Sequence, residues 1–174
     1  MAGILDERVT GKKFCTPQHP RVEPLTVSQV LQKRPSELPI VRKDSSSLAT
    51  LKLMVEHEVT AVPVMDGDGI CGIFSEHDVI QRLIRDPSTV AGATVGEIMA
   101  PCGHTARPGD LMHDCLNRMF ENRLHHLPVV EESNPIAVLS LDILLQAMVE
   151  HLEAIHREIL TGQQVMFLRG TYSC

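Results

Sequence analysis

An internal repeat limits the folds open to this chain more than any other feature of its sequence. The segment Thr26–Leu31 (TVSQVL) matches Thr94–Met99 (TVGEIM), and in both a Thr is followed three residues later by Gln or Glu. This spacing is typical of a capping box, in which the two side chains satisfy backbone N–H groups at a helix start. One unit of about 60 residues buries little core alone, so we expect the two copies to pack as a pseudo-symmetric pair.

Each copy continues with the same order of predicted elements. Apolar residues recur at helical spacing over residues 48–55 and 112–120, which predicts two amphipathic helices. A strand with a proline follows each helix, at Ala61–Met65 in the first copy and at Leu127–Val130 in the second. Second strands are predicted at 70–74 and 136–139, with helices that begin at Ser75 and near Ser140 or Asp142.

The predicted architecture is an α/β (α+β) fold of two β-α-β-β-α units. The expected boundaries are an N-terminal arm at 1–25, repeat 1 at 26–90, repeat 2 at 91–150, and a C-terminal helix extension and tail at 151–174. Apolar residues at spacings of three and four extend the last helix to about Leu160, where Gly162 is expected to stop it. Residues 165–168 are a candidate for a short strand or anchor.

The order of these elements resembles the CBS (cystathionine-beta-synthase) domain, and the tandem resembles a Bateman module, over roughly residues 24–150. The resemblance is specific in the first copy, where Gly72–Asp78 (GIFSEHD) completes the motif G-h-h-[ST]-x-x-D after the hairpin signal Asp66–Gly69. In the second copy, Ile136–Asp142 (IAVLSLD) places Ile136 at the glycine and Leu139 at the hydroxyl position, and Asp142 keeps the aspartate. The resemblance implies a cleft between repeats for AMP, ADP, ATP or S-adenosylmethionine, with no cofactor required.

Ser75 and Asp78 admit two interpretations that are compatible. As a capping box at a strand-to-helix junction, Ser75 satisfies a backbone N–H and Asp78 sits favourably against the helix dipole. The same helix N-terminus also suits an anion, and a carboxylate can accept hydrogen bonds from ribose hydroxyls. In the family, the Ser/Thr and Asp of this motif contact the phosphate and ribose of an adenosyl ligand.

The resemblance also implies that each cleft is completed by the proline strand of the other copy. Site one is then Ser75 and Asp78 with His125, His126 and Pro128, and site two is Asp142 with Thr60, Ala61, Pro63 and His77. Protonated imidazoles attract phosphate, so site one is expected to bind more tightly as the pH falls from 8 to 6. The alternative is that both histidines are ordinary surface residues at a helix end.

Zinc binding and catalysis find less support in the sequence. Cys102, His104, His113 and Cys115 are suitable zinc ligands, but their spacing is wrong for a finger, and His113 and Cys115 do not share a helix face. Motifs of hydrolases, P-loop proteins and zinc proteases do not occur. We therefore expect no metal site and no enzymatic activity.

The composition of the chain excludes several classes of partner and compartment. The chain has 16 Lys and Arg against 22 Asp and Glu, a net charge of −6, and aromatic residues make up 3%. We therefore expect no nucleic-acid binding, because little positive charge is available for a phosphate backbone and few aromatic rings for stacking on bases. The acidic start of the chain does not fit a signal peptide, and no apolar run reaches the length of a membrane span. Five cysteines without regular spacing indicate a reducing compartment, so the expected location is the cytoplasm.

The functional prediction is a non-enzymatic sensor that binds an adenosyl ligand and modulates an unidentified partner protein. The apolar stripe of the last helix outruns its repeat, which favours a homodimer, and modules that this chain resembles pair into disc-like dimers. The alternative is a ligand-free dimerisation or docking scaffold, in which Ser75 and Asp78 only cap a helix.

Overall fold

A computed structural model describes residues 23–33 and 38–168. Within residues 162–168 it describes the backbone path only. The predicted N-terminal arm at 1–25 therefore lies almost wholly outside the described residues.

The two repeats contain the predicted helices and strands in the predicted order. The first contributes α1 (Val27–Gln32), β1 (Val41–Arg42), α2 (Ser47–Glu56), β2 (Ala61–Asp66), β3 (Gly69–Ser75) and α3 (Glu76–Arg85). The second contributes the 3-10 turn η1 (Val95–Glu97), β4 (Ala100–Pro101), α4 (Met112–Asn122), β5 (His126–Glu131), β6 (Asn134–Ser140) and α5 (Leu141–Leu168). Both capping boxes form, since the side chains of Gln29 and Glu97 accept hydrogen bonds from the backbone N–H groups of Thr26 and Thr94, at 2.9 and 2.7 Å.

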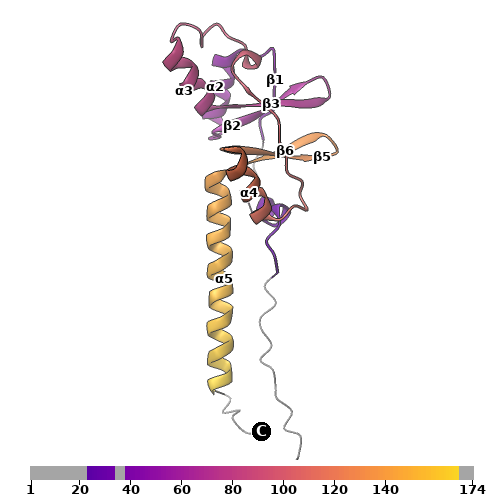
Figure 1. The fold of residues 1–174 in the computed structure, drawn as a ribbon, viewed down its shortest axis with the longest axis vertical. Coiled ribbons are helices and arrows are strands. Elements are labelled where there is room, and N and C mark those ends of the chain that lie inside the picture. The colour runs from indigo at the N-terminus through magenta and orange to yellow at the C-terminus, as the bar shows by residue number, and fades with distance from the viewer. Residues whose placement is uncertain (1–22, 34–37, 169–174) are drawn as a thin grey trace, which may run out of the picture.

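Each repeat is built on an antiparallel hairpin. The β2–β3 hairpin pairs Ala61 with Ser75, the β5–β6 hairpin pairs His126 with Ser140, and each has a register shift near the end of its proline strand. β1 joins β2 in parallel and β4 joins β3 in antiparallel, which gives a four-stranded sheet of order β1-β2-β3-β4 beside the two-stranded β5-β6. The hairpins lie one above the other, with α2 and α3 beside the first and α4 beside the second (Figure 1).

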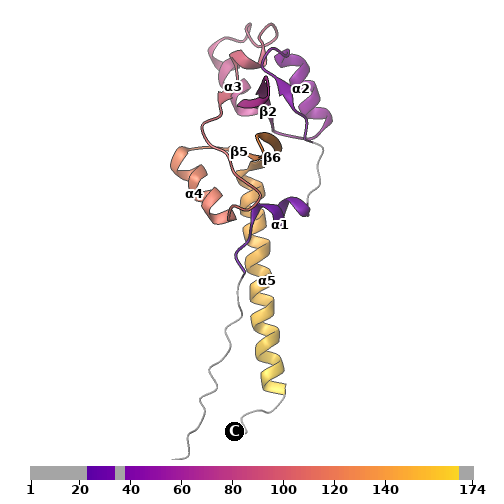
Figure 2. The ribbon, with the colours of Figure 1, turned by 90° about the vertical axis from the view of Figure 1, so that its right-hand side faces the viewer.

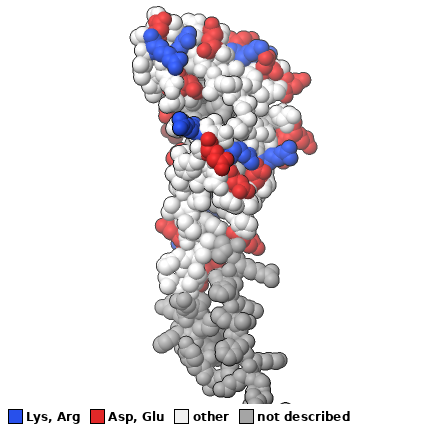
Figure 3. Space-filling model, in the orientation of Figure 1, with Lys and Arg blue, Asp and Glu red and all other residues white. Residues whose placement is uncertain are grey.

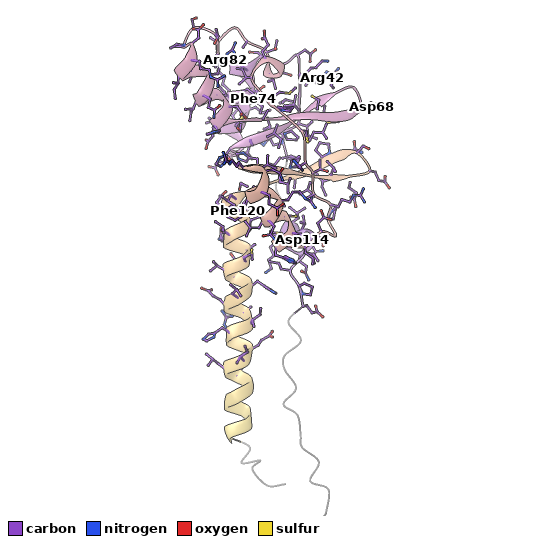
Figure 4. All side chains as sticks on the ribbon, in the orientation of Figure 1. Arg42, Asp68, Phe74, Arg82, Asp114 and Phe120 are labelled. Carbon is purple, nitrogen blue, oxygen red and sulfur yellow. The ribbon has the colours of Figure 1, made fainter. Side chains whose placement is uncertain are left out.

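The first helical turn of each repeat packs in the core of the other repeat. The first core surrounds Phe74, which is fully buried (Figure 4), and contains Val95 of the second capping-box turn. The second core surrounds Met119 and contains Val27 of α1. Backbone hydrogen bonds fix the exchange, from Val95 N to the Ser45 carbonyl at 2.8 Å and from Val27 N to the Asp110 carbonyl at 3.0 Å. Each core is therefore incomplete without the other repeat.

Helix α5 is the most elongated part of the molecule. Its first turns pack on the second core through Leu144 and Ala147, and the remainder extends away from the body (Figure 2). Two predictions are wrong here, because the helix passes through Gly162 and includes residues 165–168. A glycine within a helix costs only about 1 kcal/mol relative to Ala, and it stops a helix only where the backbone turns left-handed.

The surface of the body mixes both signs of charge. Acidic and basic side chains are interspersed on the face shown in Figure 3, without a continuous basic area. Among the helices of the described ranges, none combines the length and the apolar character needed to cross a membrane.

Candidate functional site

A cleft of about 190 Å³ lies between the repeats at the N-terminal end of α3. We call it cleft one. Three segments line it, and their residues are Ile73, Ser75, His77 and Asp78 from the first repeat, Ala100, Pro101, Cys102, Gly103 and His104 from the connection after η1, and Arg123, Leu124, His125 and His126 from the second repeat. Four of the residues predicted for site one, Ser75, Asp78, His125 and His126, thus meet in one cleft.

Ser75 and Asp78 form the capping box that the sequence predicts. The Ser75 side chain accepts a hydrogen bond from the Asp78 N–H at 3.3 Å, and Asp78 Oδ2 accepts from the Ser75 N–H at 3.2 Å and from the Ser75 hydroxyl. Ser75 is 4% exposed, while Asp78 is half-buried. Asp78 Oδ1 has no hydrogen-bond donor among the described residues, so this oxygen is available to a hydroxyl group in the cleft.

Four imidazoles line cleft one, those of His77, His104, His125 and His126. The rings of His77 and His125 lie with centroids 5.0 Å apart at a tilt of 42°, although they come from different repeats. His126 Nε2 lies 3.1 Å from Thr60 Oγ1, again across the repeats. Burial and then the neighbouring His125 lower the pKa of His126, so its neutral form is favoured. His126 is therefore a poor source of the positive charge behind the predicted increase of affinity toward pH 6.

Arg123 supplies the permanent positive charge of cleft one. It is not among the site residues predicted from the sequence. It is the residue directly after α4 and has a left-handed φ of 54°, a conformation that costs a non-glycine residue about 1 kcal/mol or more. A guanidinium matches the geometry of a phosphate, because it donates two parallel hydrogen bonds. The sequence could have indicated Arg123 as a site residue, because it lies two residues before the predicted site residue His125.

A second cleft of about 190 Å³ lies on the other side of the Thr60–His126 contact. We call it cleft two. Its lining residues are Leu31, Leu38, Glu58, Val59, Thr60, Ala61, His126, Ala137, Val138, Leu139, Ser140, Asp142 and Ile143. Thr60, Ala61 and Asp142 of the predicted site two meet here. His77, which the sequence assigned to site two, lies instead in cleft one, because it belongs to the first turn of α3.

The strand register corrects the alignment of the second motif. Pro63 pairs with Ile73 and Pro128 pairs with Val138, so Ser140 is the counterpart of Ser75, and Ala137 is the counterpart of Gly72. The hydroxyl assigned to Leu139 is thus present one residue later, on Ser140. A hydrogen bond from the Ser140 side chain is the main reason that the pKa of Asp142 lies below its usual value.

The two prolines expected at the sites do not line the clefts, and the four candidate zinc ligands are not all in one place, since only Cys102 and His104 line cleft one. Pro63 and Pro128 are buried in β2 and β5 and line neither cleft. Cys115 is fully buried in the second core, where burial raises the pKa of its thiol to about 11. No group of three or more metal-ligating side chains occurs in the described part of the chain.

The family model of the CBS domain matches residues 27–85 and again residues 95–150. The chain belongs to the CBS domain family. The two matches coincide with the two repeats that the sequence and the hairpins define, and they end at residue 150, before the projecting part of α5.

Solved structures share this fold. A signal-transduction protein with CBS domains from Burkholderia ambifaria has 29% sequence identity and a TM-score of 0.66, covering 72% of this chain and 94% of its own. The complex of CBSX2 with AMP has 25% identity and a TM-score of 0.57, covering 72% of this chain and 97% of that one. Thus at least one CBS pair of this fold binds AMP.

Curated relatives match over part of their length. The mitochondrial CBS domain-containing protein CBSX3 of Arabidopsis thaliana is 27% identical over 120 residues, which is 66% of this chain and 58% of that protein. The chain spans between 11% and 58% of the length of the first three curated relatives it matches.

Proposed function

We propose that this CBS pair is a non-enzymatic regulatory module that binds an adenosyl ligand, AMP, ADP, ATP or S-adenosylmethionine, in cleft one. The observation that carries the proposal is the meeting of Ser75 and Asp78 with His125, His126 and Arg123, which come from the other repeat. Asp78 Oδ1 is the acceptor for a ribose hydroxyl, and Arg123 is the donor for a phosphate. The AMP complex of CBSX2 supports the ligand class.

The ligand acts in this proposal by joining the repeats. It touches the start of α3 on one side and the segment after α4 on the other, so it binds most tightly to one arrangement of the two hairpins. A ligand that prefers one arrangement shifts the population toward it, and a partner protein that contacts both repeats responds to that shift. We place this action in a reducing compartment, as expected for the cytoplasm, since Cys71, Cys102 and Cys115 are free thiols.

A homodimer is part of the proposal. Large apolar side chains are exposed on the helical side of the body, including Phe120 of α4 at 60% (Figure 4) and Leu145 of α5 at 45%. Further along α5, Leu152 is 61% exposed and Ile159 is 38% exposed, at a spacing of seven residues from Leu145 onward. Such a stripe suits a second copy of the same helix. A sedimentation mass near 19 kDa at micromolar concentration would reject the dimer.

A thermal-shift titration tests the ligand site. A ligand present at 100 times its Kd adds about 2.7 kcal/mol of stability, so AMP should raise the Tm of the native protein clearly. Arg123→Gln should lose most of this shift. Glu58→Gln is the matched control, because Glu58 holds the equivalent position outside cleft one, and it should keep the shift. No shift with AMP, ADP, ATP or S-adenosylmethionine in folded protein would favour the ligand-free scaffold instead.

A further inference from the structure

Helix α5 carries an apolar stripe that continues beyond the CBS domains. The family matches end at residue 150, whereas the helix extends to Leu168 and projects from the body (Figure 2). The exposed residues of the stripe recur at spacings of four, three, four and three, and they are Leu145, Val149, Leu152, His156 and Ile159. This is the heptad pattern of a coiled coil, with positions 145, 152 and 159 at d and positions 149 and 156 at a.

The apolar residues of the stripe favour a pair of helices. A β-branched residue at a with leucine at d is typical of two-stranded parallel coils, and Val149 and Leu152 follow this rule. Val149 is 54% exposed and Leu152 is 61% exposed, so the described part of the chain leaves more than half of each uncovered. A second copy carries the identical stripe, and pairing two copies covers both stripes at once.

The residues that flank the stripe favour one direction of the second copy. In a parallel pair, Met148 of one helix faces Glu153 of the other. Ile155 faces Leu160 in the same way, so no like charges meet beside the stripe. In the antiparallel pair of greatest overlap, the two copies of Glu153 face each other, and this like-charge contact opposes association.

His156 is the one polar residue of the stripe. It lines a shallow hollow whose other described residues, Leu152, Glu153, Arg157 and Leu160, all belong to α5 itself. In a parallel pair in register, His156 meets His156 of the second copy, and a neutral imidazole N–H can donate to the unprotonated nitrogen of the other ring. In the antiparallel pair His156 faces Leu152, and this hydrogen bond is lost. A single polar residue at an a position specifies register and number of strands in this way.

We propose that α5 forms a parallel, in-register coiled coil with α5 of a second copy, and that His156 fixes its register and direction. The inference rests on the homodimer of the proposed function, and it adds which helix joins the copies and how they are oriented. Both CBS pairs then lie at the same end of the assembly.

Sedimentation equilibrium of the full chain at micromolar concentration tests which helix joins the copies. The native protein should have twice the mass of one chain, which is 19.3 kDa. Leu152→Asp should have the mass of one chain, because it places a charge in the apolar stripe. Ala154→Asp is the matched control, since it adds the same charge to an exposed position of α5 outside the stripe, and it should stay dimeric. Circular dichroism should show that both variants keep the folded body.

Cysteine cross-linking tests the direction of the helices. In a chain with Cys15→Ser and Cys174→Ser, Ile159→Cys should give a disulfide-linked dimer on air oxidation, because position 159 meets itself only in the parallel pair. Ala154→Cys in the same background should give none. His156→Val should lower the Kd of the dimer about tenfold, since an apolar layer replaces a polar one, and should reduce the yield of the cross-link at position 159.

The outcomes separate this inference from the proposed function. A native protein with the mass of one chain would overturn the inference and the homodimer, while the thermal shift with AMP decides the ligand site independently. A dimer that survives Leu152→Asp would overturn the inference and leave the homodimer standing. A dimer that Leu152→Asp dissociates but Ile159→Cys does not cross-link would contradict the parallel direction. A higher Kd in His156→Val would contradict the role of His156.

Discussion

The two clefts of this CBS pair are made by the same turns of the same repeated unit, yet they differ in charge. In both, a serine at the end of a hairpin strand faces the segment that follows an amphipathic helix of the other repeat. Cleft one places Arg123 in that segment, and cleft two places Glu58. The repeat thus sets the backbone of both clefts, while side chains at equivalent positions set the charge of each lining.

The comparison extends to the strands beside the clefts. In the first repeat, β4 pairs with β3 at Gly72 and Ile73, and its residues Ala100 and Pro101 form a wall of cleft one. In the second repeat, β6 pairs with β5 alone among the described strands, and Ala137 stands where Gly72 does. Glycine suits a position where another backbone approaches closely, as the Ala100 carbonyl does at Gly72.

Gly72→Ala should produce the largest effect on this comparison. An added Cβ would lie 2.5 Å from Met99 Sδ and 2.7 Å from the Ala100 carbonyl oxygen, so β4 must move. We expect a loss of about 1–3 kcal/mol in the free energy of unfolding, measured by urea denaturation, and weaker AMP binding. The matched change Ala137→Gly should cost less, about 0.5–1 kcal/mol. Equal losses would contradict the different roles of the two positions.

Glycine in place of each left-handed residue after a helix separates the effect on stability from the effect on AMP binding. Arg123→Gly and Glu58→Gly should each stabilise the fold by about 1 kcal/mol, because both positions have a φ near +50° that glycine adopts without strain. Calorimetry should detect similar increases in Tm. Only Arg123→Gly should reduce AMP affinity. A loss of AMP affinity in Glu58→Gly would contradict the assignment of AMP to cleft one, which Glu58 does not line.

The smallest expected effect concerns His126 in the wall between the clefts. Its pKa in the folded protein is lowered by burial, whereas the unfolded chain has the usual value of about 6.5. Below pH 6.5 the unfolded state therefore binds more protons, and the free energy of unfolding should fall as the pH falls from 6.5 toward the folded pKa. Urea denaturation at several pH values should show a smaller fall in His126→Gln. An identical profile would mean that His126 titrates alike in both states.

Much of the fold was predictable from the sequence because the repeat appears twice. The capping boxes, proline strands and amphipathic helices are local patterns, and the matching copy supported each of them. The exchange of α1 and η1 between the cores was not predictable in this way, since periodicity shows which face of Val27 or Val95 is apolar but not which core covers it. The continuation of α5 past Gly162 depends on the small cost of a helical glycine.

The part of the candidate site that follows from the family motif, Ser75 and Asp78, was predictable from the sequence. The part that depends on the strand register of the second repeat was not predicted correctly. Alignment on Asp142 placed Leu139 at the hydroxyl position, whereas alignment on Pro63 and Pro128 would have found Ser140. Arg123 and Glu58 escaped notice because a residue after a helix end ordinarily faces solvent. Their left-handed backbone and their place in the clefts become visible only in three dimensions.

A crystal structure of the full chain with AMP would show directly which cleft holds the phosphate, without the need for any variant. We expect one AMP per chain in cleft one, with its phosphate within hydrogen-bond distance of Arg123 and its ribose at Asp78. An AMP phosphate in cleft two, beside Glu58, would contradict the proposed assignment of the nucleotide to cleft one.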